Sequence, residues 1–151
     1  MVQISRILVP TDGSPMSLKA EEMAITLAKQ FKGEVRFIHV VSTPASQMPQ
    51  KEANVALEVK DWEELANEDV VSAKKYLRNA LRSAEKVKIN ASAHLYRTTY
   101  SVRESICQIA DDLDVDIIVM GTKGRSLKQV ILGSVAVGVV TYANRPVLVV
   151  R

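Results

Sequence analysis

The sequence predicts an α/β fold, an open five-stranded parallel sheet with helices on both faces. Five short apolar runs alternate with longer segments of helical periodicity along the 151 residues. Strands that alternate with helices form βαβ units with right-handed crossovers, and such units build a parallel sheet. No internal repeat and no linker divides the chain, and its length suits one domain. We therefore expect a single domain over residues 1–151.

The five predicted strands are short runs of apolar, largely β-branched residues. The last two are almost continuously apolar, as parallel strands covered on both faces are. The third alternates between apolar and polar positions, which is typical of a strand with one less buried face. The runs are Ile7–Pro10, Val35–Val41, Val87–Tyr96, Ile117–Met120 and Val147–Val150.

Four helical segments separate these strands. Ser14 is a good N-cap for the first, Pro15 suits its first turn, and Gly33 supplies a stop. The third opens with a Ser-x-x-Glu capping box. The last is ambiguous, because its valines favour a strand whereas the crossover to the final strand demands a helix. The segments run from Ser14 to Phe31, from about Trp62 to Ala84, from Ser101 to Leu113 and from Ser134 to Ala143.

The segment from Ser42 to about Asp61 contains prolines and scattered charges, so we expect a long loop. Long loops in compact α/β domains often act as lids over a site. A lid over a ligand is therefore one role for this segment.

Composition excludes several classes of protein. A net charge of +3 and 5% aromatic residues argue against nucleic-acid binding. No apolar run is long enough to span a membrane, and the N-terminus lacks a signal-peptide pattern. The single cysteine, Cys107, makes neither an internal disulfide nor a multi-thiolate metal site, so we expect a cytoplasmic protein.

Two loops at strand ends carry the residues that suit a ligand. In an open parallel sheet, ligands bind at the carboxyl ends of the strands where the strand order reverses. The loops there are Pro10–Ser14 and Gly121–Ser126, the second continuing to Gly133–Ser134. Glycines allow close backbone approach, Lys123 and Arg125 add positive charge, and a helix beginning at Ser134 offers amides to an anion. Together they predict a phosphate cradle.

Two other glycine motifs do not match. A Walker A loop needs four residues between its first glycine and the Gly-Lys pair, but only two separate Gly121 from Gly124. The dinucleotide fingerprint needs three spaced glycines after the first strand, and only Gly13 is present there.

Five stretches of the chain form a specific combination: Ile7–Ser14, Ile38–Val41, Asp116–Arg125, Gly133–Val135 and Arg145–Val150. With them the chain resembles a single-domain universal stress protein over nearly its whole length. The resemblance implies a five-stranded sheet in the order 3-2-1-4-5, of the Rossmann-like, adenine nucleotide alpha hydrolase-like type. It also implies homodimers joined through the last strand, Val147–Val150, and in one subclass bound ATP, with or without Mg²⁺.

The resemblance also implies a role for individual residues. Those beside the nucleoside would be Pro10, Thr11 and Asp12, with the Val40 backbone at the adenine edge and Met120 and Gly121 flanking sugar and base. The phosphates would be held by Gly124, Gly133, Ser134 and Val135, with Lys123 and Arg125 as counter-charges.

One departure from the family pattern bears on ATP. Eight residues separate Gly124 from Gly133, whereas the ATP-binding subclass has nine. A nucleotide-free dimer that binds other proteins, including an unknown effector, is therefore the alternative function. The sequence offers no acid–base pair, activated nucleophile or metal cluster, so we expect no enzyme. Slow ATP hydrolysis ranks last.

Some of these residues also have plain structural explanations. Asp12 fits the cap of a turn as well as a ligand site, and a hydrogen-bonded core histidine is favoured for His39 over a ligand role. A packed, inert thiol is favoured for Cys107. The final helix is apolar around Val137, Val140 and Tyr142, and we expect part of that surface to be buried against a partner.

Overall fold

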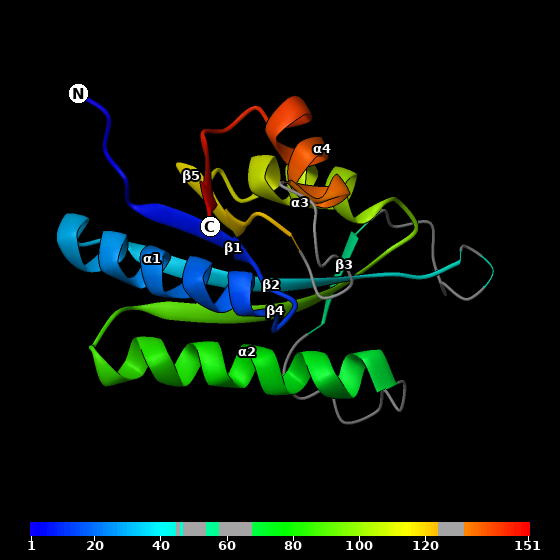
Figure 1. Cartoon of the computed structure of the whole chain (residues 1–151), viewed down its shortest axis with the longest axis horizontal. Helices are drawn as coiled ribbons and strands as arrows, with labels where there is room; N and C mark the ends of the chain where they lie inside the picture. Colours follow the sequence, from blue (N-terminus) through cyan, green and yellow to red (C-terminus); the bar gives the residue numbers. More distant parts are fainter. Residues whose placement is uncertain (45, 47–53, 58–67, 124–131) are drawn as a thin grey trace.

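The computed structural model describes residues 1–44, 46, 54–57, 68–123 and 132–151. A sheet forms the central layer, with α1 and α2 on one face and α3 and α4 on the other (Figure 1). The elements are β1 (Arg6–Pro10), α1 (Pro15–Phe31), β2 (Glu34–Ser42), β3 (Asn54–Leu57), α2 (Glu68–Lys86), β4 (Ala91–Thr98), α3 (Val102–Asp112), β5 (Ile117–Gly121), α4 (Ser134–Tyr142) and β6 (Val147–Val150).

The strand order within the described residues is β3-β4-β2-β1-β5-β6. The five predicted strands correspond to β1, β2, β4, β5 and β6, all parallel, so the predicted order 3-2-1-4-5 is confirmed. The predicted strand number was one too few. A sixth strand, β3, pairs antiparallel with β4 at the edge, with Asn54 opposite Thr98.

The sixth strand lies inside the segment that was expected to be a loop, Ser42–Asp61. Ser42 is the last residue of β2, and Asn54–Leu57 form β3. Positions 45, 47–53 and 58–67 lie outside the described residues, and so does the predicted start of the second helix near Trp62.

The caps of α1 and α3 follow the prediction. The Ser17 amide donates to the Ser14 hydroxyl at 3.2 Å, Pro15 occupies the first turn, and the capping box of α3 is complete. At the end of α1, however, the left-handed residue is Lys32, with φ 56°. Gly33 is needed for another reason, because a Cβ there would lie 2.8 Å from the Ser5 carbonyl oxygen.

The predicted start of the third predicted strand, which corresponds to β4, was too early. The prediction placed it at Val87, but residues 87–90 turn out of α2 and the strand begins at Ala91. Lys88 takes a left-handed conformation, with φ 59°, and the Ile89 amide donates back to the Ala84 carbonyl at 3.0 Å. The alternation of apolar residues begins in the turn that ends α2 and runs on into β4. Periodicity alone therefore does not show where the strand begins.

The ambiguous last segment is a helix. β5 and β6 are parallel neighbours, so the chain between them must cross back along the sheet. α4 packs on α3 at Gly138, where a Cβ would come within 2.3 Å of the Arg103 side chain. That close approach overrides the strand propensity of the valines.

The core has two halves, one on each face of the sheet. Val9 and Phe37 pack with Leu77 of α2 on one face, while Leu8 and Ile106 of α3 pack on the other. Residues next to each other in a strand therefore face opposite helical layers. At the carboxyl end of each strand, successive side chains therefore point to opposite faces of the sheet.

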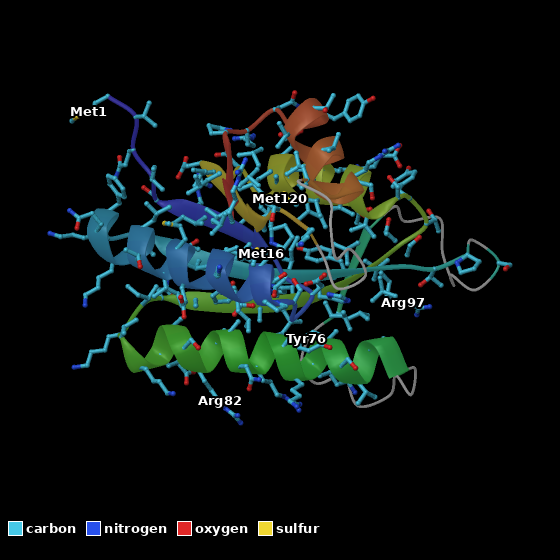
Figure 2. All side chains as sticks on the ribbon, in the orientation of Figure 1. Met1, Met16, Tyr76, Arg82, Arg97 and Met120 are labelled. Atoms are coloured by element: carbon cyan, nitrogen blue, oxygen red, sulfur yellow. The ribbon has the colours of Figure 1, made fainter. Side chains whose placement is uncertain are left out.

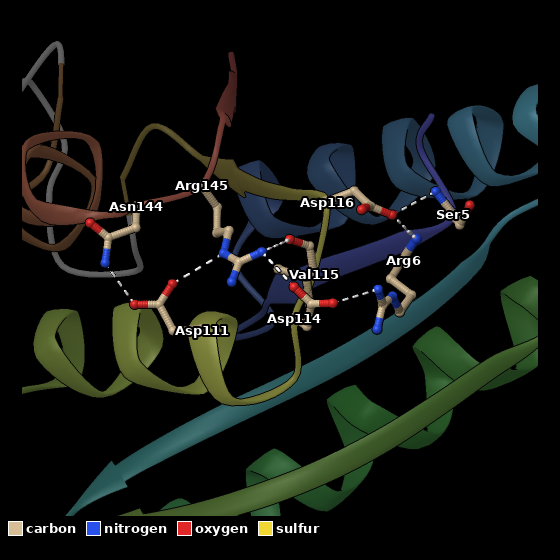
Figure 3. Close-up of polar contacts among 8 residues, drawn as sticks. All are labelled: Ser5, Arg6, Asp111, Asp114, Val115, Asp116, Asn144 and Arg145. Atoms are coloured by element: carbon tan, nitrogen blue, oxygen red, sulfur yellow. Dashed lines mark hydrogen bonds and ion pairs between the residues drawn. The ribbon is translucent and has the colours of Figure 1, made fainter. Parts of the chain in front are cut away.

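An ion-pair network ties together the amino ends of the strands, at the opposite rim from the predicted site (Figure 3). Arg145 contacts Asp111 at 3.1 Å and Asp114 at 2.9 Å, and Arg6 contacts Asp114 at 2.8 Å. Asp116 accepts the Arg6 amide at 2.8 Å. The network joins the start of β1 to the turns that precede β5 and β6.

Candidate nucleotide-binding site

A cavity of about 350 Å³ lies at the carboxyl ends of β1, β2 and β5. This volume is in the range of small-molecule sites. The predicted residues that line it are Pro10, Thr11, Asp12, Val40, Met120, Gly121, Lys123, Gly133, Ser134 and Val135. The other two predicted residues, Gly124 and Arg125, lie outside the described residues.

The loop after β1 and the loop after β5 meet here because their strands are neighbours, with Ile7 opposite Ile117. Gly121 ends β5 against the first turn of α1, where a Cβ would lie 2.8 Å from the Met16 carbonyl carbon. A glycine is therefore required at this position by packing, whatever ligand the cavity holds.

One end of the cavity is formed by the first turn of α4. Gly133 is the N-cap and has no side chain with which to cap the helix. The first amides of a helix have no carbonyl partner within it, and the helix dipole favours an anion there. The amides of Ser134, Val135 and Ala136 occupy this position, and Lys123 lines the same cavity.

The Gly133 amide is used within the fold. It donates to the Thr122 carbonyl at 2.6 Å, which fastens the start of α4 to the end of β5. This bond orients the uncapped turn toward the cavity. Four residues were expected to hold the phosphates. Of these, Ser134 and Val135 have backbone amides at the helix start that can bind a phosphate.

Asp12 is held rigidly at the side of the cavity. Its Oδ1 accepts the Ser14 amide at 2.9 Å and the Ser17 hydroxyl at 2.6 Å. Burial raises the pKa of this carboxyl, but the hydrogen bonds from Ser14 and Ser17 and the nearby His39 outweigh it and hold the pKa below its ordinary value. Asp12 is therefore an ionised acceptor, suited to sugar hydroxyls or amino groups.

His39 lines the same part of the cavity. Its Nδ1 lies 2.7 Å from the Thr11 carbonyl oxygen, which only accepts hydrogen bonds, so Nδ1 carries a proton. The hydrogen bond expected for a core histidine is confirmed. The ring is only half-buried, however, and borders the cavity rather than being enclosed in the core.

The rest of the lining was not predicted. Ile38, Val102 and Ile106 form an apolar wall with Met120, and Ser17, His39 and Ala136 complete the boundary. Ile38 could have been found, because it lies two positions before Val40 and therefore on the same face of β2. Val102 and Ile106 lie one turn apart on α3, and only the packing of that helix over the sheet brings them here.

The described residues also bear on a reactive thiol, a metal site and a membrane span. Burial raises the pKa of the Cys107 thiol, which opposes formation of a reactive thiolate. Across the described ranges, no three His, Cys, Asp or Glu residues are grouped so that they could hold a metal ion. Among the same residues, no helix has the length and apolar character needed to cross a membrane.

Comparison with protein families gives the assignment. The model of the universal stress protein family matches residues 3–151. The chain belongs to the universal stress protein family. Universal stress protein MJ0531 of Methanocaldococcus jannaschii is 32% identical to it over 148 residues, covering 97% of this chain and 81% of the relative.

Solved structures of other family members confirm the fold. A universal stress protein from Archaeoglobus fulgidus in complex with dAMP superposes with a TM-score of 0.72 at 21% identity, covering all of both chains. A family protein from Arabidopsis thaliana with AMP bound gives a TM-score of 0.67 at 13% identity, covering 97% of this chain and 90% of that one. The Rossmann-like α/β architecture predicted from the sequence is therefore the architecture of the family.

Proposed function

We propose that this universal stress protein binds an adenine nucleotide, with ATP as the expected ligand, and acts as a homodimeric binding module in stress signalling. The observation that carries the proposal is the cavity with two unlike ends. One end offers the uncapped first turn of α4 and Lys123, and the other offers the apolar wall of Ile38, Val102 and Ile106. A phosphate fits the first end and a base fits the second. Relatives with bound dAMP and AMP support this choice.

The ligand orientation follows from these two ends. The phosphates would accept hydrogen bonds from the amides of Ser134 and Val135, with Lys123 as counter-charge. The base would lie against the apolar wall and the Val40 backbone. The sugar would then lie near Asp12, whose ionised carboxylate accepts hydroxyl hydrogen bonds. The resemblance implied the same orientation.

Bound nucleotide would act on the protein by ordering the residues around the phosphates. A ligand shifts a conformational equilibrium only through its different affinities for the two states. In this proposal the nucleotide binds best when the start of α4 and the loop after β5 are in place. A partner would then recognise the ligand-bound surface. Mg²⁺ would be carried with the phosphates, since the described residues supply no carboxylate cluster for it.

We propose binding rather than catalysis. Among the described lining residues Asp12 is the carboxylate, but two hydrogen bonds engage its Oδ1 and its pKa is lowered, which makes it a poor general base near neutral pH. Slow hydrolysis of ATP would have to rely on water without an activating residue. We place the protein in the cytoplasm, as a chain with one thiol suggests.

The proposed dimer forms through β6. This strand is at the end of the sheet order, and its outer backbone groups are available to a second copy. Next to it, α4 exposes apolar side chains, with Val137 46%, Val140 49% and Tyr142 67% exposed. These exposed side chains also favour the alternative function, a nucleotide-free dimer that binds an effector protein through its helices.

Nucleotide retained during purification distinguishes the two functions. The protein is purified, denatured by heat, and the supernatant is analysed by HPLC and mass spectrometry. We expect an adenine nucleotide in the supernatant, or a rise in the thermal midpoint when ATP is added to ligand-free protein. Neither signal would be seen with the nucleotide-free dimer.

A further inference from the structure

A second cavity opens beside the first one. It has a volume of about 230 Å³ and is lined by Asp12, His39, Val40, Val41, Ser42, Ser72 and Tyr76. Three of these residues, Asp12, His39 and Val40, also line the first cavity. The two spaces therefore meet at the carboxyl ends of β1 and β2.

The two cavities lie on opposite sides of the sheet edge. Val40 packs with the core half under α3, whereas Val41 packs with the half under α2. The first cavity is accordingly bounded by α3 and α4, and the second by Ser72 and Tyr76 of α2. A ligand that occupies both must cross the sheet edge at Val40.

Tyr76 forms a fixed wall of the second cavity. In Figure 2 it rises from α2 toward the loop after β1, whereas Arg82 on the same helix points away from the sheet. A Cβ on Gly13 would lie 2.3 Å from the Tyr76 ring, so the ring rests directly on this glycine. The second cavity is thus bounded by packed side chains on the α2 side.

The lining is polar and includes the ionised carboxylate of Asp12. Ser72 contributes a hydroxyl and Tyr76 a phenol, and the Ser42 hydroxyl, which donates to the Tyr100 carbonyl at 3.1 Å, can only accept from a ligand. Nδ1 of His39 is committed to the Thr11 carbonyl, which leaves Nε2 as the ring nitrogen for a ligand. Among the described lining residues there is no lysine or arginine. A second phosphate or a carboxylate would therefore be repelled, whereas a neutral hydroxyl group would find donors and acceptors.

We propose that the second cavity is a subsite for a neutral, hydroxyl-bearing substituent on the exocyclic amino group of the bound adenine. The inference rests on the proposed function, in which the phosphates lie at α4 and the base lies at Val40. The exocyclic amino group is the part of an adenine nucleotide farthest from its phosphates, so it faces the junction between the cavities. At roughly 30 Å³ per water-sized group, the second cavity holds a chain of about seven such groups.

The test compares three ligands by isothermal titration calorimetry. They are AMP, AMP with a 4-hydroxybutyl chain on the exocyclic nitrogen, and AMP with a 3-carboxypropyl chain there. We expect the hydroxybutyl derivative to bind about tenfold more tightly than AMP, through one or two added hydrogen bonds. We expect the carboxypropyl derivative to bind about tenfold more weakly than AMP, because of Asp12.

Variants of α2 locate the effect. Ser72→Leu fills the second cavity, and Ser83→Leu is the matched control, since Ser83 is exposed on the same helix away from the cavity. Ser72→Leu should weaken binding of the hydroxybutyl derivative about tenfold and leave AMP binding unchanged. Ser83→Leu should change neither. If Ser72→Leu does not fold, the affinities of the three ligands for the unaltered protein still test the subsite.

Two results would overturn the inference, and they are distinguishable. If AMP binds and the hydroxybutyl derivative binds no more tightly than AMP, the subsite does not exist and the nucleotide site stands. If AMP and ATP both fail to bind, the proposed function fails and the subsite fails with it.

Discussion

The hydroxyl of Thr11 donates a hydrogen bond to Oε1 of Glu21, with an oxygen–oxygen distance of 2.5 Å. Both residues are buried, at 4% exposure each. The bond ties the loop after β1, which borders the candidate site, to the second turn of α1. It also engages the Thr11 hydroxyl within the protein, and the Thr11 amide donates to the Ile38 carbonyl at 2.8 Å.

Burial makes Glu21 a source of pH-dependent stability. It raises the pKa of Glu21 above the ordinary value of 4.5, and the charge of Asp12 adds to the shift. A carboxyl with a raised pKa in the folded state stabilises the fold below its unfolded pKa, and that stability is lost as pH rises through the folded pKa. The contribution of Glu21 to stability should therefore fall as pH rises above about 4.5.

Glu21→Gln should remove this pH dependence. The amide oxygen of glutamine still accepts from the Thr11 hydroxyl, but no charge forms. At pH 7 the variant should equal or exceed the unaltered protein in stability by about 1 kcal/mol, the scale of one buried hydrogen bond. Urea unfolding at pH 4 and pH 7 measures this, with Glu85→Gln, at an exposed position of α2, as control. An unchanged pH dependence in Glu21→Gln would refute the assignment.

Gly13→Ala should destabilise the protein for two reasons. The residue has a φ of 74°, and a Cβ would lie 2.3 Å from the Tyr76 ring. The left-handed conformation alone costs an alanine about 1–2 kcal/mol. In a Tyr76→Ala background, the same change should cost less, because the contact is gone. Equal costs in both backgrounds, measured by chemical unfolding, would argue against the packing of Tyr76 on Gly13.

The ion-pair network at the opposite rim should matter most at low salt. Hydrogen bonds from Asn144 and Arg145 lower the pKa of Asp111, and those from Arg145 and Arg6 lower the pKa of Asp114. Groups of this kind stabilise the fold above their ordinary pKa of 3.8, and the contribution is lost as pH falls through the folded value.

Arg145→Met should reduce the thermal midpoint slightly at pH 7, and high salt should shrink the difference. The same variant should lose less stability than the unaltered protein on acidification below pH 4. Arg151→Met, at the exposed C-terminus, is the control. A loss that does not depend on salt would mean that the aliphatic stem of Arg145, rather than its charge, carries the effect.

The exposed apolar side of α4 should be covered in the dimer. Val137 is 46% exposed, and a charge there would be desolvated at an interface between two copies. Val137→Glu should therefore shift the protein from dimer to monomer in analytical ultracentrifugation. Val71→Glu, which changes a 56% exposed valine on the other face of the sheet, should leave the dimer intact. An unchanged oligomer in Val137→Glu would exclude this surface from the interface.

Much of the fold could be predicted because its signals are local. The N-cap Ser14, the capping box at Ser101 and the apolar runs of β1 and β5 each report on a few neighbouring residues. β3 escaped prediction because four residues, Asn54–Leu57, form a strand only through their antiparallel pairing with β4. No pattern within four residues carries that information.

The candidate site divides in the same way. The glycine loops and Asp12 could be found from their spacing after predicted strands. Val102 and Ile106 could not, because their place depends on how α3 lies over β2. Nor could the sequence show that the Gly133 amide donates to Thr122, since that bond joins the two ends of a ten-residue excursion of the chain.

The uncapped first turn of α4 is the centre of this account, and Ser134→Pro tests it most directly. Proline suits the first turn of a helix, and Gly133, with φ −70° and ψ 161°, already has the extended conformation that a residue before proline adopts. The change removes one amide and one hydroxyl from the proposed phosphate site and leaves α4 intact. Ser134→Ala, which removes the hydroxyl alone, is the matched control.

Calorimetric titration with ATP gives the decisive measurement. We expect binding to the unaltered protein, and a loss of affinity of tenfold or more in Ser134→Pro, on the scale of one hydrogen bond to a charged group. Ser134→Ala should lose clearly less. Equal affinities in the unaltered protein and Ser134→Pro, or no binding to either, would contradict the claim that α4 holds the phosphates.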